Sequence, residues 1–245
     1  MKGALRLLYP AQCPGCGDPV AGGTGAEAQL CPDCWRETRF ITGTCCGRCG
    51  APLPDDGAPL PDSALICDDC LSIARPWRHG RAAMTYSGTG RVLVLALKHG
   101  DRPDLAAPLA GWLSRAAAPL IRPGMVVAPV PLHLRRLMKR KYNQAALVSA
   151  HLARARGLAH LPDLLVRTRH TEGQDHRDVG DRFANVAGAI AVNPRRRDRI
   201  GGRPVLLVDD VMTSGATLAA AAGALLAAGS GPVSVAVLAR AVKDD

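Results

Sequence analysis

The chain has 245 residues, of which 47% are hydrophobic and only 3% aromatic, so Ala, Leu and Val must fill its core. This length suits one large domain or two smaller ones. Its longest uncharged apolar stretch, at 216–228, is too short for the roughly 18 residues that a membrane-spanning helix needs. Residues 1–9 lack the apolar core of an export signal. We therefore expect a cytoplasmic protein without membrane insertion.

The formal net charge of +10 is distributed unevenly along the chain. Residues 1–78 carry 7 Lys and Arg against 9 Asp and Glu, whereas residues 79–245 carry 24 against 12. The composition changes near residues 75–80, so we predict a small domain at 1–78 and a larger basic domain at 79–245. The basic excess of the larger domain would attract polyanions.

All nine cysteines lie in the first of these domains, and eight of them form four C-x-x-C pairs. Such a pair turns tightly and places two thiolates on one tetrahedral ion, and the spacing of the pairs fits four-cysteine zinc ribbons. Disulfides are disfavoured in a chain without an export signal. We predict two structural Zn²⁺ sites, with sequential pairing favoured over a cross-brace and Cys45 left over. The predicted ligands are Cys13, Cys16, Cys31, Cys34, Cys46, Cys49, Cys67 and Cys70.

The first half of the basic domain is predicted to alternate strands with helices. We expect a strand at 81–86, a helix at 91–98 that closes with Lys98, and a second helix at 103–118 with Asp101 as its cap. A buried strand is expected at 125–131, followed by a helix that Asn143 caps and that runs to about Arg156.

Five basic residues lie between Arg135 and Lys141, in a segment that we predict to be a loop at the carboxyl end of strand 125–131. Open parallel sheets bind ligands along that edge, and Arg offers bidentate contacts to phosphate oxygens. The run is therefore a candidate diphosphate site. The alternative is a solvated basic loop without a ligand.

The second half of the domain begins with a predicted short strand at 164–167. Residues 168–185 are polar and mixed in charge, which is typical of a mobile lid and equally of a disordered segment. A short strand is expected at 189–192, a basic linker at 194–202 and the last strand at 233–238.

The most informative segment of the chain lies between the basic linker and the last strand. Four aliphatic residues, Val205–Val208, predict a strand buried on both faces that ends in Asp209 and Asp210. The chain then turns through residues 213–217 into an Ala- and Leu-rich helix at 218–228, closed by Gly229. A polar turn at a helix N-terminus favours a phosphate, and the two acids could hold ribose hydroxyls or a hydrated Mg²⁺. An ordinary turn with solvated acids is the alternative.

Residues 205–217 resemble the phosphoribosyl-diphosphate (PRPP) loop of type I phosphoribosyltransferases, in which the acids contact the ribose and the loop binds its 5′-phosphate. Together with Pro129–His133, Tyr142–Gln144 and Arg167–Arg169, and with the double zinc ribbon, the pattern resembles the ComF family of bacterial competence proteins. The resemblance implies an α/β fold with a parallel sheet, a PRPP site with Mg²⁺ and a role in DNA uptake. Three residues depart from the pattern: Ile190 replaces an aromatic residue, and Lys141-Tyr142 replaces Gly-Phe.

These patterns define the candidate residues. The candidate catalytic residues are Asp209, Asp210, Arg135 and Arg136, and the candidate ligand-binding residues are Asp209 and Asp210 with Thr213, Ser214, Gly215, Ala216, Thr217, Lys98 and Arg140.

Three functions are consistent with the sequence. The chain could transfer phosphoribose to an acceptor, as an active phosphoribosyltransferase. It could instead handle single-stranded DNA through its basic surface, with a vestigial or regulatory PRPP site. Third, its zinc ribbons could be an adaptor for a DNA-uptake helicase or channel protein. Base-stacking platforms are scarce in the basic domain, which offers only Trp112, Tyr86, Tyr142 and Phe183.

Overall fold

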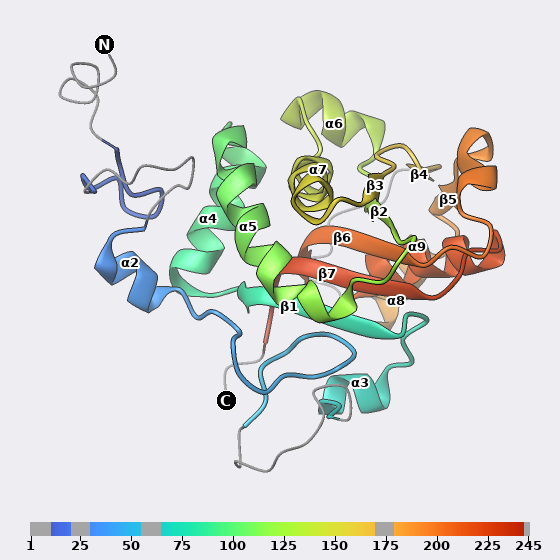
Figure 1. Cartoon of the computed structure of the whole chain (residues 1–245), viewed down its shortest axis with the longest axis horizontal. Helices are drawn as coiled ribbons and strands as arrows, with labels where there is room; N and C mark the ends of the chain where they lie inside the picture. Colours follow the sequence, from blue (N-terminus) through green and yellow to red (C-terminus); the bar gives the residue numbers. More distant parts are fainter. Residues whose placement is uncertain (1–10, 21–29, 55–64, 170–178, 243–245) are drawn as a thin grey trace.

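In the computed structural model of the chain, the described residues are 11–20, 30–54, 65–169 and 179–242. A five-stranded sheet forms the centre, with the strand order β1-β7-β6-β2-β3 (Figure 1). All neighbouring strands are parallel, as their continuous hydrophobic runs predict. The strands are β1 (His79–Thr85), β2 (Val126–Pro129), β3 (Ala159–His160), β6 (Val205–Met212) and β7 (Val233–Arg240).

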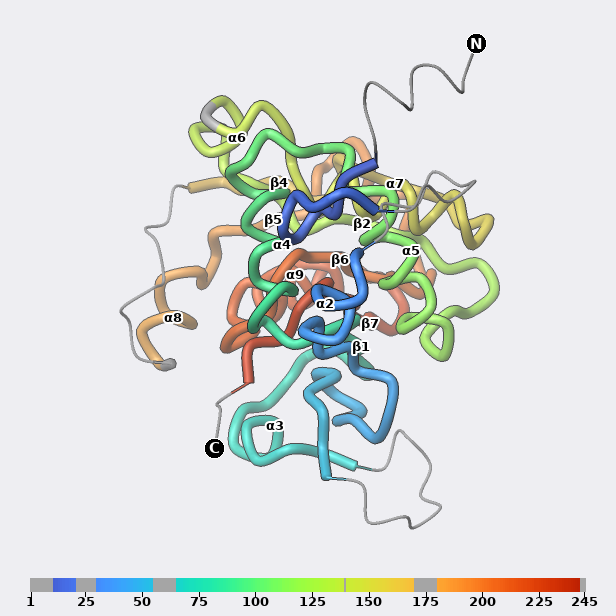
Figure 2. Tube along the Cα trace, turned by 90° about the vertical axis from the view of Figure 1, so that its left-hand side faces the viewer, coloured from blue at the N-terminus to red at the C-terminus, as the bar shows by residue number. Residues whose placement is uncertain are grey.

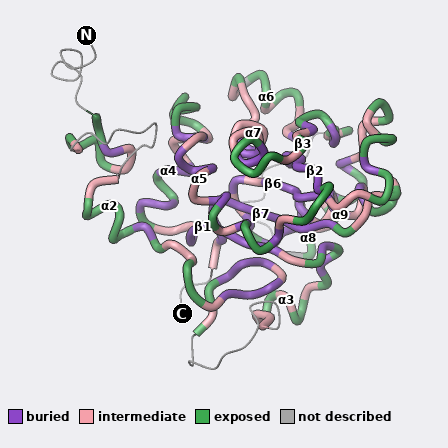
Figure 3. The backbone as a smooth tube through the Cα atoms, viewed as in Figure 1, coloured by how far each residue is buried: buried purple, intermediate pink, exposed green. Residues whose placement is uncertain are grey.

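Helices cover both faces of this sheet, because alternate residues of each strand point to opposite sides. Leu206 and Val208 share one hydrophobic cluster with helices α4 (Gly88–His99), α5 (Ala106–Ala116) and α7 (Gln144–Arg156). Val205 and Leu207 belong to a second cluster with α9 (Ala216–Ala227). Figure 3 shows the buried backbone concentrated in the strands between these helices.

A smaller antiparallel pair of strands lies beside the main sheet. It consists of β4 (Leu165–Arg167) and β5 (Ile190–Val192), and both strands fall within the predicted segments. Residues 179–185 of the predicted lid lie in helix α8 (Val179–Val186), while 170–178 lie outside the described residues. The predicted linker contains a 3₁₀ turn, Pro194–Arg199.

The two cysteine-bearing segments contact different parts of the α/β unit. Helix α2 (Pro32–Glu37) lies beside α4, where Thr89 Oγ1 donates a 2.6 Å hydrogen bond to Glu37 Oε2. Helix α3 (Asp68–Ser72) lies beyond β1, at the opposite end of the molecule from α6 (Leu134–Arg140) in both Figure 1 and Figure 2. Cys46 and Cys49 belong to the same core cluster as α9. We propose that a domain boundary lies between residues 78 and 79, and that the second cysteine-bearing segment packs on the larger domain through this core cluster.

Backbone hydrogen bonds join these N-terminal segments to the outer edge of β1. The amide of Ile41 donates to Ala83 O at 3.0 Å, that of Thr85 to Arg39 O at 2.9 Å, and that of Gly80 to Gly47 O at 2.9 Å. An edge strand otherwise leaves such groups unpaired. The N-terminal segments therefore protect this edge of the sheet.

Two expectations about helices in the first half of the domain need correction. The helix expected at 103–118 begins with a 3₁₀ turn, Pro103–Leu105, and α5 follows it. The basic run expected to be a loop forms α6, and His133 Nδ1 caps it by accepting from Arg135 N at 3.2 Å. This run contains neither Gly nor Pro, and its Leu, Arg, Met and Lys residues favour helix.

Other boundaries follow the sequence closely. Asn143 caps α7, because its Oδ1 accepts from the amides of Ala145 at 3.0 Å and Ala146 at 3.4 Å. Gly229 follows α9 with φ of 86°, in the left-handed region that Gly adopts without strain. Among the described helices, none has the length and apolar character needed to cross a bilayer.

Candidate metal centres and phosphate site

The eight predicted zinc ligands form two clusters, each containing four cysteine sulfurs within 4.8 Å of one another. Their membership is sequential: Cys13, Cys16, Cys31 and Cys34 form the first cluster, and Cys46, Cys49, Cys67 and Cys70 form the second. The favoured pairing is therefore the one in the structure. Cys45 is buried and lies outside both clusters.

The geometry of both clusters fits tetrahedral zinc. Zn–S bonds of about 2.3 Å place the sulfurs of a tetrahedron about 3.8 Å apart. The Cys16 and Cys31 sulfurs are 3.7 Å apart, and those of Cys49 and Cys67 are 3.5 Å apart. Backbone amides also donate to the sulfurs, as Cys67 N does to Cys46 Sγ at 3.4 Å. Each cluster thus has the donor set and spacing of a structural zinc site.

Two buried arginines flank the second cluster. Arg75 is 6% exposed, and its Nε and Nη2 have no hydrogen-bond partner among the described residues. Cys46 and Cys49 raise the pKa of the Cys70 thiol, and Arg75 opposes them. Burial by itself would lower the pKa of Arg240, but the Cys49 thiolate and the Asp69 carboxylate raise it. Four thiolates on one Zn²⁺ carry about two negative charges, which is the counter-charge that two buried guanidinium groups need.

The same two arginines hold the turn that follows β6. Arg75 Nη1 donates to Ser214 O. Arg240 Nη1 donates to Met212 O at 3.3 Å and to Thr213 O at 2.8 Å, while its Nη2 bonds Asp69 Oδ2 at 3.0 Å. The second cysteine cluster is therefore connected directly to the predicted phosphate loop. Sequence reasoning missed both arginines, because no local pattern near Arg75 or Arg240 indicates a contact with residues 212–214.

The predicted phosphate loop is tightly packed at its centre. Gly215 has φ of 79°, and a Cβ added there would lie 2.6 Å from Arg75 Nη1 and 3.2 Å from Trp77 Cη2. Ser214 and Ala216 are buried, and Thr213 is exposed. The amide of Ala216 donates to Ser214 Oγ at 3.4 Å, and α9 begins at this residue. Thr217 is half-buried in the first turn of α9.

The strand was expected to end in the two acids, but β6 continues two residues beyond them. Asp209 is paired with Val237 of β7, and the strand continues to Met212 because Met212 is paired with Arg240. Consecutive residues of a strand point to opposite faces. Asp210 Oδ1 lies 3.1 Å from Lys98 Nζ of α4, whereas Asp209 interacts electrostatically with Arg167 of β4. The sequence did not indicate Arg167 as a ligand residue, although it is part of the family-like segment 167–169.

The acids differ in their electrostatic environment. Burial, followed by the negative charge of Asp210, raises the pKa of Asp209 to about 7. The amide of Asp210, at 2.9 Å from Asp209 Oδ1, and the cations Lys98 and Arg167 act in the opposite direction. Asp209 can therefore gain or lose a proton close to neutral pH. Such a carboxyl at the carboxyl end of a parallel strand is a candidate functional group.

A basic cavity of about 330 Å³ adjoins the acids through Lys98. It lies between the end of α4 and helix α6, and its wall contains Lys98, Arg136 and Arg140 of the predicted set. Arg140 Nη1 bonds Gln144 Oε1 at 3.5 Å, and Gln144 Nε2 bonds Lys98 O at 3.2 Å. Arg135 is exposed on α6 and is not part of this wall. The structure therefore assembles three of the four predicted phosphate-binding cations in one cavity.

Lys141 is one of the departures from the family pattern, and it stands where the backbone is left-handed. It ends α6 with φ of 65°, a conformation in which Gly is normally preferred. Its Nζ forms a 2.6 Å ion pair with Asp101, which also has a positive φ, of 53°. Asp101 was expected to cap the following helix, but the residue before that 3₁₀ turn is Arg102.

Comparisons with known proteins match the cysteine-rich segment to a family model and nearly the whole chain to bacterial relatives. The family model described as "Double zinc ribbon domain" matches residues 4–76. The DNA utilization protein YhgH of Salmonella typhi is 31% identical over 240 residues, covering 96% of this chain and 99% of the relative. Competence protein F of Haemophilus influenzae is 28% identical over 198 residues, with coverage of 79% and 82%. Competence protein ComFC of Bacillus subtilis is 26% identical over 210 residues, with coverage of 83% and 80%.

A structural comparison matches a glutamine PRPP amidotransferase from B. subtilis in complex with ADP and GMP. It has 18% sequence identity and a TM-score of 0.39, and the match covers 58% of this chain and 30% of that longer chain. The predicted α/β fold, with a parallel sheet and an N-terminal zinc-ribbon module, is confirmed. With a relative at 31% identity over nearly its full length, the chain belongs to the ComF family.

Proposed function

We propose that the chain binds PRPP or another phosphoribosyl ligand with Mg²⁺ at the carboxyl edge of its sheet, and that it takes part in handling single-stranded DNA. The observation that carries the proposal is the 3.1 Å contact between Lys98 Nζ and Asp210 Oδ1. This contact joins the two acids of β6 to the basic cavity beneath α6. A sugar phosphate that also carries a diphosphate needs both kinds of group within one ligand length.

Each group in this proposed site has a distinct role. The loop Thr213–Thr217, at the N-terminus of α9, would hold the 5′-phosphate. Asp209 and Asp210 would hold the ribose hydroxyls, or a hydrated Mg²⁺ through their carboxylate oxygens. Lys98, Arg136 and Arg140 would offset the charge of the diphosphate, and Arg135 would join them from the exposed side of α6.

Mg²⁺, when bound, would neutralise charge on the diphosphate. Two of the chain's own groups already balance the charge of the acids: Lys98 is paired with Asp210, and Asp209, with its pKa raised to about 7, is partly protonated at neutral pH. A divalent ion would therefore compete with the ammonium group and the proton. We accordingly expect ligand binding to release protons at pH 7.

Calorimetry on folded, zinc-loaded protein with PRPP and Mg²⁺ tests the binding site. We expect measurable heat that is lost in Asp210→Asn. The matched control is Asp163→Asn, which removes a carboxylate that is likewise paired with a cation, Arg196 at 2.9 Å, but is exposed. If the folded wild-type protein gives no heat, the proposal is wrong.

The role in DNA handling rests on a different observation. The relatives are named DNA utilization protein and competence proteins, and the basic domain has twice as many cationic as anionic residues. Electrostatic DNA binding predicts that affinity for single-stranded DNA falls steeply with salt. The affinity should also weaken when Arg135, Arg136 and Arg140 are neutralised together.

Two further assays separate the remaining functions. Release of diphosphate from PRPP and Mg²⁺ in the presence of a panel of acceptors would establish phosphoribosyl transfer. Capture of a DNA-uptake helicase or channel protein that fails when residues 13–70 are deleted, while PRPP still binds, would establish an adaptor role for the zinc ribbons.

A further inference from the structure

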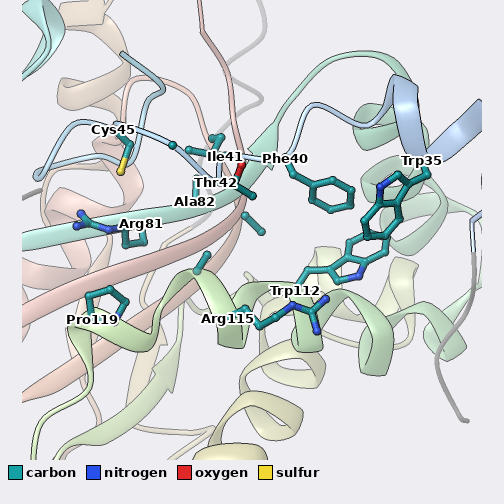
Figure 4. Close-up of a pocket in the computed structure, with 13 residues that line it drawn as sticks. Trp35, Phe40, Ile41, Thr42, Cys45, Arg81, Ala82, Trp112, Arg115 and Pro119 are labelled. Carbon is teal, nitrogen blue, oxygen red and sulfur yellow. The ribbon is translucent and has the colours of Figure 1, made fainter. Parts of the chain in front are cut away.

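A groove of about 550 Å³ lies along the outer side of β1, where the N-terminal segment faces helix α5 (Figure 4). This volume is in the range of small-ligand sites. One wall comes from residues 35–45, the floor from residues 81–83 of β1, and the opposite wall from α5 and the turn after it. The groove lies at the edge strand, whereas the proposed phosphoribosyl site lies at the end of β6, with β7 between them.

Three aromatic rings gather at one end of this groove, as Figure 4 shows. The ring centroids of Trp35 and Phe40 are 4.6 Å apart, and Trp112 meets Phe40 edge-on at 5.0 Å and Trp35 edge-on at 6.2 Å. Packing of this kind holds the N-terminal segment against α5. Trp35 nevertheless remains 50% exposed, so the cluster offers ring surface to a ligand.

The lining also contains two cations among apolar and neutral residues. Arg81 lies at the end of the groove opposite the aromatic rings, and the exposed Arg115 lies on α5 (Figure 4). Arg81 is only 7% exposed and its Nη1 donates to Gly80 O at 3.0 Å, so Arg115 is the more accessible of the two cations. No acidic residue is among the described residues that line the groove. Its charge is therefore complementary to an anion that also carries a flat ring.

The positive charge continues along β1 beyond the groove. Burial and then the charges of four arginines lower the pKa of His79, at the start of β1. A second cavity of about 330 Å³ opens there, lined by Arg48, Arg78 and His79. The four arginines that act on His79 are Arg122, Arg81, Arg78 and Arg48. A phosphodiester chain leaving the groove would therefore meet further cations.

We propose that this groove binds nucleotides of single-stranded DNA, with a base stacked on Trp35, a phosphate against the exposed Arg115, and the largely buried Arg81 adding positive charge to the groove. The inference rests on the proposed role in DNA handling and is independent of PRPP binding. A phosphoribosyl ligand without a base has no ring to stack, and a duplex keeps its base faces inside the stack. Single strands combine exposed bases with a charged backbone, and stacking platforms beside basic grooves are how proteins bind them.

The strand would follow the β1 edge from the aromatic end of the groove towards Arg78 and Arg48. Sequence reasoning found few stacking platforms because it counted only the aromatic residues of the basic domain. Trp35 and Phe40 come from the cysteine-rich segment and reach Trp112 only through the fold. The zinc ribbon thus completes a binding surface that neither part has alone.

Fluorescence anisotropy with a labelled oligo-dT of about 15 nucleotides tests this on full-length, zinc-loaded protein. Loss of one stacked base costs about 1–3 kcal/mol, so Trp35→Ala should weaken binding roughly 5- to 150-fold, and Trp35→Phe should restore most of the affinity. Arg115→Gln should weaken binding and reduce the dependence of log affinity on log salt by about one. The matched controls are Leu71→Ala, an exposed apolar residue on α3, and Arg102→Gln, an exposed arginine paired with Asp104.

An abasic oligonucleotide of the same length separates stacking from charge, because it keeps the phosphates and lacks the bases. Wild-type protein should bind it more weakly than oligo-dT, and Trp35→Ala should bind both equally. Zinc content, circular dichroism and PRPP heat of Trp35→Ala should match the wild type, which shows that the variant folds. The proposal is overturned if Trp35→Ala binds oligo-dT as the wild type does, or if oligo-rU binds preferentially. If the wild-type protein gives no heat with PRPP, only the proposed phosphoribosyl site is contradicted, and the proposal for the groove stands or falls on the oligonucleotide data.

Discussion

Arg240 is the residue whose removal should show most clearly that the second zinc cluster and the phosphate loop are one structural unit. Its side chain is 3% exposed and donates to two loop carbonyls, Met212 O at 3.3 Å and Thr213 O at 2.8 Å, and to the carboxylate of Asp69 at 3.0 Å. The substitution Arg240→Met keeps much of the side-chain volume and removes all of these donors. The loop then loses one of its two connections to the cysteine cluster and keeps the one through Arg75.

The magnitude follows from these contacts. A buried hydrogen bond from a charged donor contributes about 1.5–3 kcal/mol. Met212 O keeps a second donor, the amide of Ala241 at 2.9 Å, and Asp69 is half-exposed and can be solvated. We therefore expect the free energy of unfolding to fall by about 3–4 kcal/mol, which is less than the sum over all the bonds. For a chain of this size, that corresponds to a melting temperature lower by roughly 6–16 °C.

Urea unfolding of zinc-loaded protein, followed by circular dichroism, measures this loss. The matched control is Arg203→Met, because Arg203 also donates to two backbone carbonyls, Gly124 O at 3.1 Å and Arg199 O at 3.2 Å, but at the surface. Solvent can replace those bonds, so the control should lose no more than about 1 kcal/mol. Equal losses in the two variants would refute the view that burial makes Arg240 important. Arg240→Met should also bind PRPP more weakly, whereas Arg203→Met should bind it as the wild type does.

Four further predictions address the acids, the loop, the end of α6 and the metal. Because the folded-state pKa of Asp209 is raised to about 7, the native state keeps a proton that the unfolded state loses above about pH 4. The free energy of unfolding of the wild type relative to Asp209→Asn should therefore fall by up to about 1.4 kcal/mol per pH unit from pH 4 to 7 and level off above pH 7. Urea unfolding at several pH values measures this, and a difference in unfolding free energy that does not change with pH would contradict the buried-acid interpretation. Gly215→Ala should lower stability more than Gly229→Ala, because both glycines have positive φ but only at Gly215 would the new Cβ meet Arg75; equal melting temperatures would exclude the clash. Lys141→Gly should be more stable than Lys141→Ala by about 1 kcal/mol in urea unfolding, since both lose the exposed ion pair with Asp101 and only Gly relieves the left-handed backbone. Cys46→Ser and Cys16→Ser should each lose about half of the bound zinc by colorimetric release assay, but only Cys46→Ser should destabilise the α/β core, because Cys46 is fully buried in it and Cys16 is exposed.

Several elements followed from local sequence alone. The C-x-x-C pairs, the Asn143 cap and the glycine after α9 depend on residues a few positions apart, so the short-range pattern indicates them directly. The buried strand Val205–Val208 and the turn after it were equally visible, because a parallel strand covered on both faces needs a continuous apolar run. The basic run at α6 was misjudged as a loop because its charge density was weighted above its strong helix propensity.

Contacts between distant parts of the chain came only from the tertiary structure. The sequence determined that two cysteine clusters, a tight turn between β6 and α9 and a pair of acids exist, since each is encoded within one or two short segments. Only the fold decided that Lys98 meets Asp210, that Arg75 and Arg240 connect the second cluster to the loop, and that Trp35 joins Trp112 at the β1 edge. The physical reason is that burial and packing between distant segments determine these contacts and raise the pKa of Asp209. Such contacts produce no periodic pattern in the local sequence.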